Sequence, residues 1–163
     1  MRLAIISDTH LPRGGRVIPV TCLEQCRRAD AILHAGDFID VAAVESIRSL
    51  GPPVHAVYGN ICRPEVQEML PERLEVELGG ARIGMVHIPG PSKGRAARLG
   101  RWFPDCDLIV FGHTHMPEHE QLPSGAQIFN PGSPTERRRA PVHTMGIATI
   151  TDGVVDLELA DLG

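Results

Sequence analysis

Five short apolar runs in this chain each end in a residue that can bind a metal ion. The first run, 3–7, leads into Asp8 and His10, and the last run, 108–112, leads into His113 and His115. Runs of this length and composition predict buried strands. Because ligands bind outside the carboxyl ends of strands in open α/β sheets, the side chains that follow should gather at one edge. The seven candidates are Asp8, His10, Asp37, Asn60, His87, His113 and His115.

Strand and helix patterns alternate in the first half of the chain, whereas hairpin patterns dominate the second half. Gly79-Gly80 and Asp152-Gly153 each separate two β-rich segments, as tight hairpin turns do. This order favours mixed sheets with helices outside over a purely parallel sheet. Asp40 is expected to cap one helix and Pro64 to open the next. The predicted strands are 2–7, 31–36, 54–58, 73–78, 82–86, 108–111, 127–129, 145–151 and 154–159, and the predicted helices are 19–28, 41–50, 64–70 and 95–103.

The length of 163 residues fits one domain over residues 1–163, without an internal repeat or a linker. A net charge of −4 and an aromatic content of 4% disfavour nucleic acid as a partner, because its recognition relies on cationic and stacking side chains. No apolar run approaches the ~18 residues that span a membrane, and the first residues lack a signal-peptide pattern. We therefore expect a cytoplasmic protein that binds neither nucleic acid nor membrane.

The four cysteines, Cys22, Cys26, Cys62 and Cys106, include no C-x-x-C pair. Without a secretion signal, reduced thiols are expected. Cys22 and Cys26 lie one helical turn apart, which is compatible with packing on one helix face or with a metal or redox role. Cys62 follows Asn60 closely, and we interpret it as a packing residue rather than a ligand.

Each motif taken singly has an ordinary structural explanation. Asp and Asn commonly form turns after strands, so Asp37 and Asn60 do not by themselves indicate a metal site. His87 alone fits a polar strand end. His113 and His115 are more informative, since residues two apart can point to one side of an extended chain. The joint occurrence of oxygen and imidazole donors at successive strand ends favours a metal centre.

Six short motifs are spread over nearly the whole chain, and the first five hold the seven candidates: Ser7–His10, Gly36-Asp37, Gly59-Asn60, His87, Gly112–His115 and Asn130–Ser133. Their order and spacing resemble the calcineurin-like metallophosphoesterase superfamily, and most closely its small bacterial and archaeal phosphodiesterases without a cap domain. The resemblance implies an α/β four-layer sandwich, in which two mixed central sheets carry helices on both outer faces. It also implies hydrolysis of small phosphate esters, chiefly phosphodiesters, and a homodimer or larger oligomer.

The resemblance assigns three ligands to each of two divalent metal ions per chain and makes Asp37 the bridge between them. The ions would lie ~3.5–4 Å apart and share a hydroxide that attacks phosphorus. Ligands without thiolates suit Mn²⁺, our first choice, and also Fe, Zn²⁺ or Ni²⁺. The implied ligands are Asp8, His10 and His115 for the first ion and Asn60, His87 and His113 for the second. The implied catalytic residues are Asp37, Asn60, His87, His113 and His115, and the implied substrate contacts are Asn60 and His10.

Two positions depart from the superfamily pattern and leave a second function open. Ile61 stands where many members carry a histidine that is thought to protonate the leaving group. Ile88-Pro89 follows His87, where relatives usually have Gly-His. Without an acid, poor leaving groups should react more slowly, by a factor of ~10²–10⁴. The alternative is a non-catalytic or weakly catalytic metal-binding scaffold, as in a eukaryotic retromer subunit that resembles these enzymes and serves chiefly as an interaction module.

Several polar residues outside the motifs have two interpretations. His34 and His55 lie in apolar runs and are expected to be core histidines that orient a ligand loop. The basic residues of 93–101 form either a solvated helix face or a rim that contacts phosphate. Arg137-Arg138-Arg139 is either a solvated run or a guide for a longer phosphate substrate.

Overall fold

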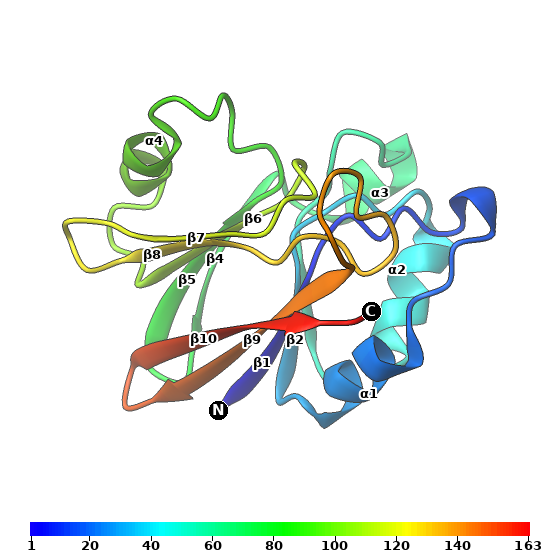
Figure 1. Ribbon diagram of the computed structural model, residues 1–163, viewed down its shortest axis with the longest axis horizontal. Coiled ribbons are helices and arrows are strands. Elements are labelled where there is room, and N and C mark those ends of the chain that lie inside the picture. The colour runs from blue at the N-terminus through cyan, green and yellow to red at the C-terminus, as the bar shows by residue number, and fades with distance from the viewer.

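The structure is a computed structural model that describes residues 1–163, and its two five-stranded sheets pack face to face (Figure 1). In the first sheet, β1, β2 and β3 are parallel, while β9 and β10 form a hairpin that joins β1 antiparallel. The three parallel strands therefore deliver the loops that follow them to one edge. The order of this sheet is β10 (Val154–Asp161), β9 (Thr144–Thr151), β1 (Arg2–Ile6), β2 (Ala31–His34) and β3 (Val54–Ala56).

The second sheet is also mixed. Its three central strands, β5, β6 and β8, are parallel, and β4 and β7 run antiparallel at the two edges. The loops after β5 and β6 thus leave at a common edge as well. The order of this sheet is β4 (Arg73–Leu78), β5 (Ala81–Val86), β6 (Leu108–Phe111), β8 (Gln127–Asn130) and β7 (Glu118–Gln121).

Both faces of β1 are apolar because side chains alternate along a strand and each face packs against a separate core. Leu3 and Ile5 point between the sheets, where they join a core that includes Met85 of the second sheet. Ala4 and Ile6 point outward into a separate core beneath the helices. These four side chains are fully buried, and each large one contributes about 1.5–3 kcal/mol to stability.

Helices cover the outer face of each sheet and complete four layers (Figure 1). The first sheet carries α1, α2 and α3, and the second carries α4, whose Leu99 packs with Ile109 and Phe111 of β6. This arrangement confirms the predicted sandwich. No helix is both long and apolar enough to cross a membrane. The helices are α1 (Val20–Arg28), α2 (Val41–Arg48), α3 (Pro64–Met69) and α4 (Arg95–Trp102), with a 3-10 turn η1 at Arg13–Gly15.

All predicted strands and helices are present, with ends shifted by one or a few residues. Asp40 caps α2 by accepting a hydrogen bond from the Ala43 amide at 3.0 Å, and Pro64 opens α3, both as predicted. The prediction missed β7, because Glu118–Gln121 is entirely polar. This segment pairs only with β8 at a sheet edge, where no apolar alternation is needed.

Candidate metal centre

The seven predicted ligands lie together in the loops that follow β1, β2, β3, β5 and β6. Five of them have left-handed backbone, with φ between 49° and 71°. This conformation is unfavourable for residues other than glycine and is concentrated at functional sites. Hydrogen bonds hold it here, since the Asp8 amide donates to the Gly36 carbonyl and the His10 amide to the Asp37 carbonyl, both at 3.0 Å. The site backbone is therefore fixed by the fold.

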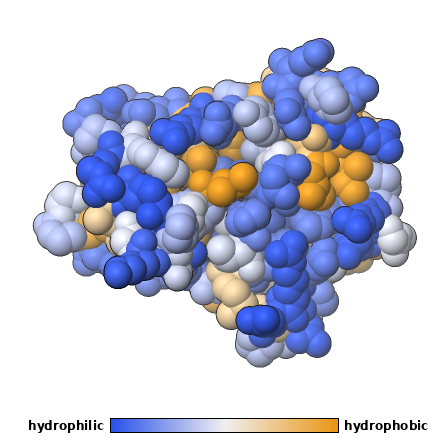
Figure 2. Space-filling model, turned by 90° about the horizontal axis from the view of Figure 1, so that it is seen from above, coloured by the Kyte–Doolittle hydropathy of each residue, from blue (hydrophilic) through white to orange (hydrophobic).

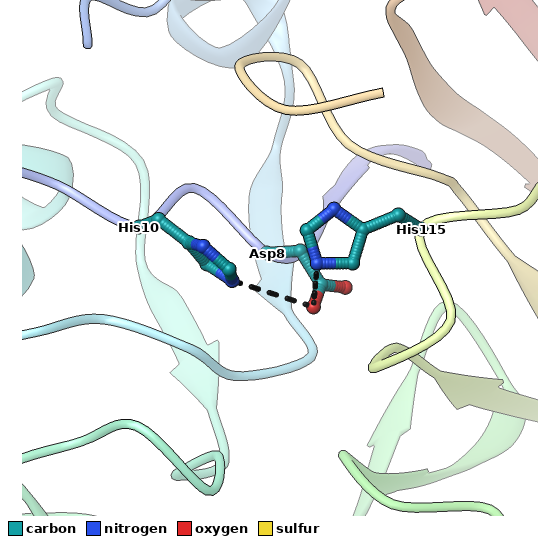
Figure 3. A group of neighbouring side chains, drawn as sticks. All are labelled: Asp8, His10 and His115. Carbon is teal, nitrogen blue, oxygen red and sulfur yellow. Dashed lines mark ion pairs between the residues drawn. The ribbon is translucent and has the colours of Figure 1, made fainter. Parts of the chain in front are cut away.

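Asp8 lies between the rings of His10 and His115 (Figure 3). Its Oδ1 atom is 3.2 Å from Nε2 of His115 and 3.9 Å from Nε2 of His10. All three side chains are buried, yet neither Asp8 Oδ1 nor His115 Nε2 has a hydrogen-bond partner. The other oxygen, Oδ2, accepts hydrogen bonds from the Ser7 hydroxyl at 2.7 Å and the His113 amide at 3.0 Å. Oδ1 is therefore the oxygen that is free to bind a cation.

The Asp37 carboxylate faces two histidines at once. Its Oδ2 atom is 3.2 Å from Nε2 of His10, and its Oδ1 atom is 3.2 Å from Nε2 of His87. Oδ1 also accepts a hydrogen bond from the Ile61 amide at 3.2 Å. With Asp8 Oδ1 4.0 Å from His87 Nε2, the side chains of Asp8, Asp37 and His87 form a second group of possible ligands. This arrangement suits a carboxylate that two cations share.

Asn60 brings the two remaining histidines together at the open end of the site. Its Oδ1 atom lies 3.1 Å from Nε2 of His87 and 2.8 Å from Nδ1 of His113. Asn60 is exposed and His113 is half-buried, whereas His87 is buried. One amide oxygen and two imidazole nitrogens thus meet beside the anionic Asp37, as a set of neutral donors.

The imidazole nitrogens on the far side of the rings contact the protein. Nδ1 of His87 lies 2.7 Å from the Ala35 carbonyl, and Nδ1 of His115 contacts the Glu136 carbonyl. Nδ1 of His10 lies 2.6 Å from Oε2 of Glu136. A carbonyl can only accept, so Nδ1 of His87 and His115 carries a proton and Nε2 faces the centre. An Nε2 lone pair and a neighbouring carboxylate oxygen repel each other unless a proton or a metal ion lies between them. These residues therefore fit a bound cation.

Charges within the site keep both carboxylates ionised. Burial would raise the pKa of Asp8, but contacts with His115 and His87 outweigh it and hold the pKa below its ordinary value. Burial opposes ionisation of Asp37 too, yet His10 and His87 lower its pKa strongly. Burial would lower the pKa of His87, but Asp37 and Asp8 outweigh burial and raise it. Both carboxylates are therefore ionised near neutral pH, as cation binding requires.

Two glycines allow the loops to approach the carboxylates closely. A Cβ atom at Gly59 would lie 2.0 Å from Asp37 Oδ1. A Cβ atom at Gly112 would lie 2.1 Å from Ser7 Oγ and 2.8 Å from Asp8 Oδ2. No side chain fits at Gly59 unless Asp37 moves, or at Gly112 unless Ser7 and Asp8 move, so these glycines are steric requirements of the site.

Glu136 was not predicted, although it contacts two of the candidate ligands. It lies on a loop that folds back over the end of β1, because the Ser133 hydroxyl donates to the Asp8 carbonyl at 2.8 Å and the Thr135 hydroxyl to the Thr9 carbonyl at 2.7 Å. No local sequence signal marks Glu136. Its role depends on contacts between segments more than 100 residues apart.

His34 is a core residue that ties two loops together, as predicted. Its Nδ1 atom accepts a hydrogen bond from the Gly36 amide at 3.2 Å, so the proton lies on Nε2, 3.1 Å from the Thr9 hydroxyl. The ring stacks on Phe38 with a centroid distance of 3.7 Å. Complete burial lowers the pKa of His34 to about 3, although Asp8 opposes this shift.

Two basic residues considered as a phosphate-contacting rim have structural roles instead. Arg95 pairs with Glu118, and Arg98 donates to the carbonyls of Pro89, at 2.8 Å, and Pro91. These guanidinium groups therefore hold the loop after β5 and the edge strand in place.

The cysteines are buried and none forms a disulfide. Cys22 and Cys26 lie in the core beneath the helices, which supports a packing role. Cys62 also packs there, and its sulfur accepts a hydrogen bond from the Gly59 amide at 3.1 Å. No thiolate joins the candidate ligands, so the donor set consists of oxygen and nitrogen atoms.

Apolar residues border the centre on two sides. Exposed Ile88 follows one candidate ligand and exposed Met116 follows another. The face seen from above, where the loops after the strands lie, shows separate hydrophobic patches among polar residues (Figure 2). A small cavity of about 60 Å³ adjoins Asn60 and His87 on the Ile88 side. Its other lining residues are Tyr58, Gly59, Glu72 and Val86.

Comparison with known proteins gives consistent matches. Residues 1–153 match the family model described as the calcineurin-like phosphoesterase superfamily domain. A probable metallophosphoesterase of Methanothermobacter thermautotrophicus is 33% identical over 141 residues, which are 85% of this chain and 80% of the relative. A phosphodiesterase of Methanocaldococcus jannaschii is 25% identical, and the match covers 97% of this chain and 94% of the relative. The structure of wild-type Vps29 from Entamoeba histolytica complexed with Zn²⁺ matches with a TM-score of 0.78 at 26% identity, over 100% of both chains.

Proposed function

Because the chain belongs to the calcineurin-like phosphoesterase superfamily, we propose that it is a metal-dependent phosphoesterase that acts chiefly on phosphodiesters. The observation that carries this function is the position of Asp37. Its two oxygens lie 3.2 Å from Nε2 of His10 and 3.2 Å from Nε2 of His87. One carboxylate thus joins two groups of donors that fit divalent ions.

In this proposal each ion has three ligands of its own and shares Asp37 with the other. The ligands are Asp8, His10 and His115 for the first ion and Asn60, His87 and His113 for the second. Imidazole, carboxylate and amide donors favour Mn²⁺, with Fe, Zn²⁺ and Ni²⁺ as alternatives. When bound, the two ions supply Lewis acidity toward phosphoryl oxygens and lower the pKa of coordinated water.

Among the candidate substrate contacts, Asn60 is better placed than His10. Asn60 is exposed, and its amide NH₂ is available to a phosphoryl oxygen while Oδ1 faces the two histidines. His10 is buried and its ring nitrogens face Asp37 and Glu136, so in this proposal it serves as a metal ligand and does not reach substrate.

The charge of the centre favours diesters mildly. Two divalent ions bring four positive charges, and Asp8 and Asp37 remove two of them. The remaining two positive charges balance one hydroxide and one phosphodiester monoanion. A hydroxide with a monoester dianion would exceed them by one negative charge. The ions therefore dominate the local field in a protein whose net charge is −4.

The departure of the leaving group depends on its own acidity. The half-buried Ile61 follows Asn60 and offers no proton, and only its backbone amide takes part in the site, by donating to Asp37. Activated aryl esters should therefore react well, and alkyl esters should lack the ~10²–10⁴-fold contribution of a general acid.

The test uses Mn²⁺-loaded protein with bis(p-nitrophenyl) phosphate and p-nitrophenyl phosphate. We expect faster turnover of the diester, and a loss of at least ~100-fold in kcat/KM for Asp37→Asn and for His115→Ala. The matched controls are Asp105→Asn and His119→Ala, which change exposed residues away from the centre and should retain wild-type rates. Equal rates in all four variants would refute the assignment of the site.

A metal-binding interaction module is the second candidate function, and the observation that favours it is the missing acid at Ile61. This function predicts two bound metal ions per chain and no turnover of any phosphate ester. Calorimetric metal titration beside the turnover assay separates the two functions.

The proposal also includes a single domain over residues 1–163, a cytoplasmic location and a homodimer or larger oligomer. Limited proteolysis tests the first, cell fractionation the second, and light scattering on the purified protein the third. A protease-sensitive site inside a helix or strand would contradict the single domain. A membrane-bound fraction would contradict the cytoplasmic location, and a monomeric mass would contradict the oligomer.

A further inference from the structure

A second, larger cavity opens beside the proposed metal centre. Its volume is about 390 Å³, which falls within the ~300–1,000 Å³ of small-ligand pockets. Thr114, which stands between the ligands His113 and His115, forms part of its wall, so the cavity begins next to the centre. The lining residues are Thr114, Met116, Arg138 and Arg139.

A tight turn at 137–140 presents the two arginines to this cavity. The Ala140 amide donates to the Arg137 carbonyl at 2.8 Å, and the Arg137 guanidinium donates to the Ala140 carbonyl at 2.8 Å. Arg138 has left-handed backbone with φ 49°, which is unfavourable for a residue other than glycine. Two hydrogen bonds between Arg137 and Ala140 thus close the turn, and Arg138 and Arg139 lie at its tip.

The segment before this turn is anchored to the metal centre. Ser133 and Thr135 donate to carbonyls of Asp8 and Thr9, and the Glu136 carbonyl contacts His115. The loop between β8 and β9, orange in Figure 1, accordingly lies beside the loop after β6. The position of the turn relative to the centre is therefore set by the fold.

Neither tip arginine has a carboxylate partner or a side-chain hydrogen bond. By contrast, Arg16 pairs with Glu136 at 2.9 Å and Arg95 pairs with Glu118. No acidic residue lines the cavity, in a chain with more acidic than basic residues. Guanidinium groups bind phosphate oxygens in a bidentate manner, so two unpaired arginines in a ligand-sized cavity suit a phosphate group.

Building on the proposed function, we propose that this cavity binds a second phosphate group of the substrate through Arg138 and Arg139, while the metal centre holds the scissile phosphodiester. The substrate class is thereby narrowed to small esters that carry two phosphate groups. Turnover of a simple aryl diester does not require the second group, so the proposed function and this subsite can be tested separately.

The experiment measures binding of alkyl phosphonates to the Mn²⁺-loaded protein by isothermal titration calorimetry. The ligands are α,ω-bisphosphonates with one to four methylene groups and the corresponding monophosphonates, which cannot be hydrolysed. In the wild type, at least one bisphosphonate should bind about tenfold more tightly than its monophosphonate. The series of lengths covers the unknown span between the two phosphate positions.

The double variant Arg138→Gln/Arg139→Gln should reduce this gain to less than threefold. The matched control is Arg27→Gln/Arg28→Gln, which removes two adjacent exposed arginines from α1 and should retain the full gain. The subsite is refuted if no bisphosphonate shows a gain in the wild type, or if the gain persists in the first double variant. Wild-type protein that neither turns over bis(p-nitrophenyl) phosphate nor binds a monophosphonate would instead refute the proposed function, and the subsite with it.

Discussion

Oε2 of Glu136 lies 2.6 Å from Nδ1 of His10, and the main-chain carbonyl of the same residue contacts Nδ1 of His115. One residue outside the ligand set therefore orients two proposed ligands of the first ion. The Glu136 carboxylate also lies 2.9 Å from the guanidinium of Arg16. Partial burial opposes its ionisation, but the charges of His10 and Arg16 outweigh burial and lower the pKa of Glu136.

Glu136→Gln should weaken Mn²⁺ binding about tenfold, the lower end of the ~10–100-fold range for partners of metal ligands. The substitution removes the charge that faces His10 but retains the size of the side chain and the main-chain contact to His115. Calorimetric titration of the metal-free protein with Mn²⁺ measures the effect. Arg16→Gln is the control and should change affinity less than threefold. An equal loss in both variants would show that the arginine, and not the contact with His10, is responsible.

Gly59→Ala should destabilise the protein by about 1–3 kcal/mol, as overpacking typically does, and should also abolish most diester turnover. The new Cβ atom would lie 2.0 Å from Oδ1 and 2.5 Å from the amide nitrogen of Asp37, so the proposed bridging ligand must move. Gly100→Ala is the matched control, because its Cβ atom meets only the flexible end of Leu122, at 3.0 Å. Chemical denaturation and the aryl diester assay measure both variants. Full activity in Gly59→Ala would mean that Asp37 does not need its present position.

The gathering of the candidate ligands at one place could be predicted because strand ends are strongly marked in the sequence. Fully apolar runs such as Leu108–Phe111 require burial on both faces, and this fixes where the chain leaves the core. The residue after each run must then lie at the sheet edge. Glycine marks the same places, since Gly59 and Gly112 leave room for Asp37 and Asp8.

The remaining features depend on tertiary contacts that have no local pattern. The strand at Glu118–Gln121 is polar because it lies at an edge, so no apolar alternation marks it. Glu136 reaches His10 only because a loop folds back across the end of β1. The left-handed backbone of Asp8 is held by the Gly36 carbonyl, which lies on another strand connection.

Acid should destabilise the metal-free protein partly through His34. Its pKa of about 3 in the folded state lies below the ~6.5 of an unfolded histidine. Between these values the unfolded chain binds a proton that folded His34 does not, so stability rises with pH across this window. The contribution is complete above ~6.5 and decreases by about 1.4 kcal/mol for each pH unit below it.

The variant His34→Gln isolates this contribution, because glutamine does not titrate but retains a donor for Thr9. Between pH 6.5 and 5, the wild type should lose about 2 kcal/mol more stability than the variant. Denaturation with urea at several pH values in the presence of EDTA provides the measurement. Parallel pH profiles for the two proteins would show that His34 takes up a proton as readily in the folded state as in the unfolded chain.

Metal binding should raise the melting temperature without being required for folding. Hydrogen bonds from the Asp8 and His10 amides already hold the strained backbone of the site, so the protein should remain folded in EDTA. Mn²⁺ at about 100 times its dissociation constant adds ~2.7 kcal/mol, which corresponds to about 5–11 °C for a chain of this length. His115→Ala removes a proposed ligand of the first ion and should lose most of this increase, whereas the exposed His119→Ala should retain it. Calorimetric melting with and without Mn²⁺ decides between these outcomes, and an undiminished increase in His115→Ala would exclude His115 as a ligand.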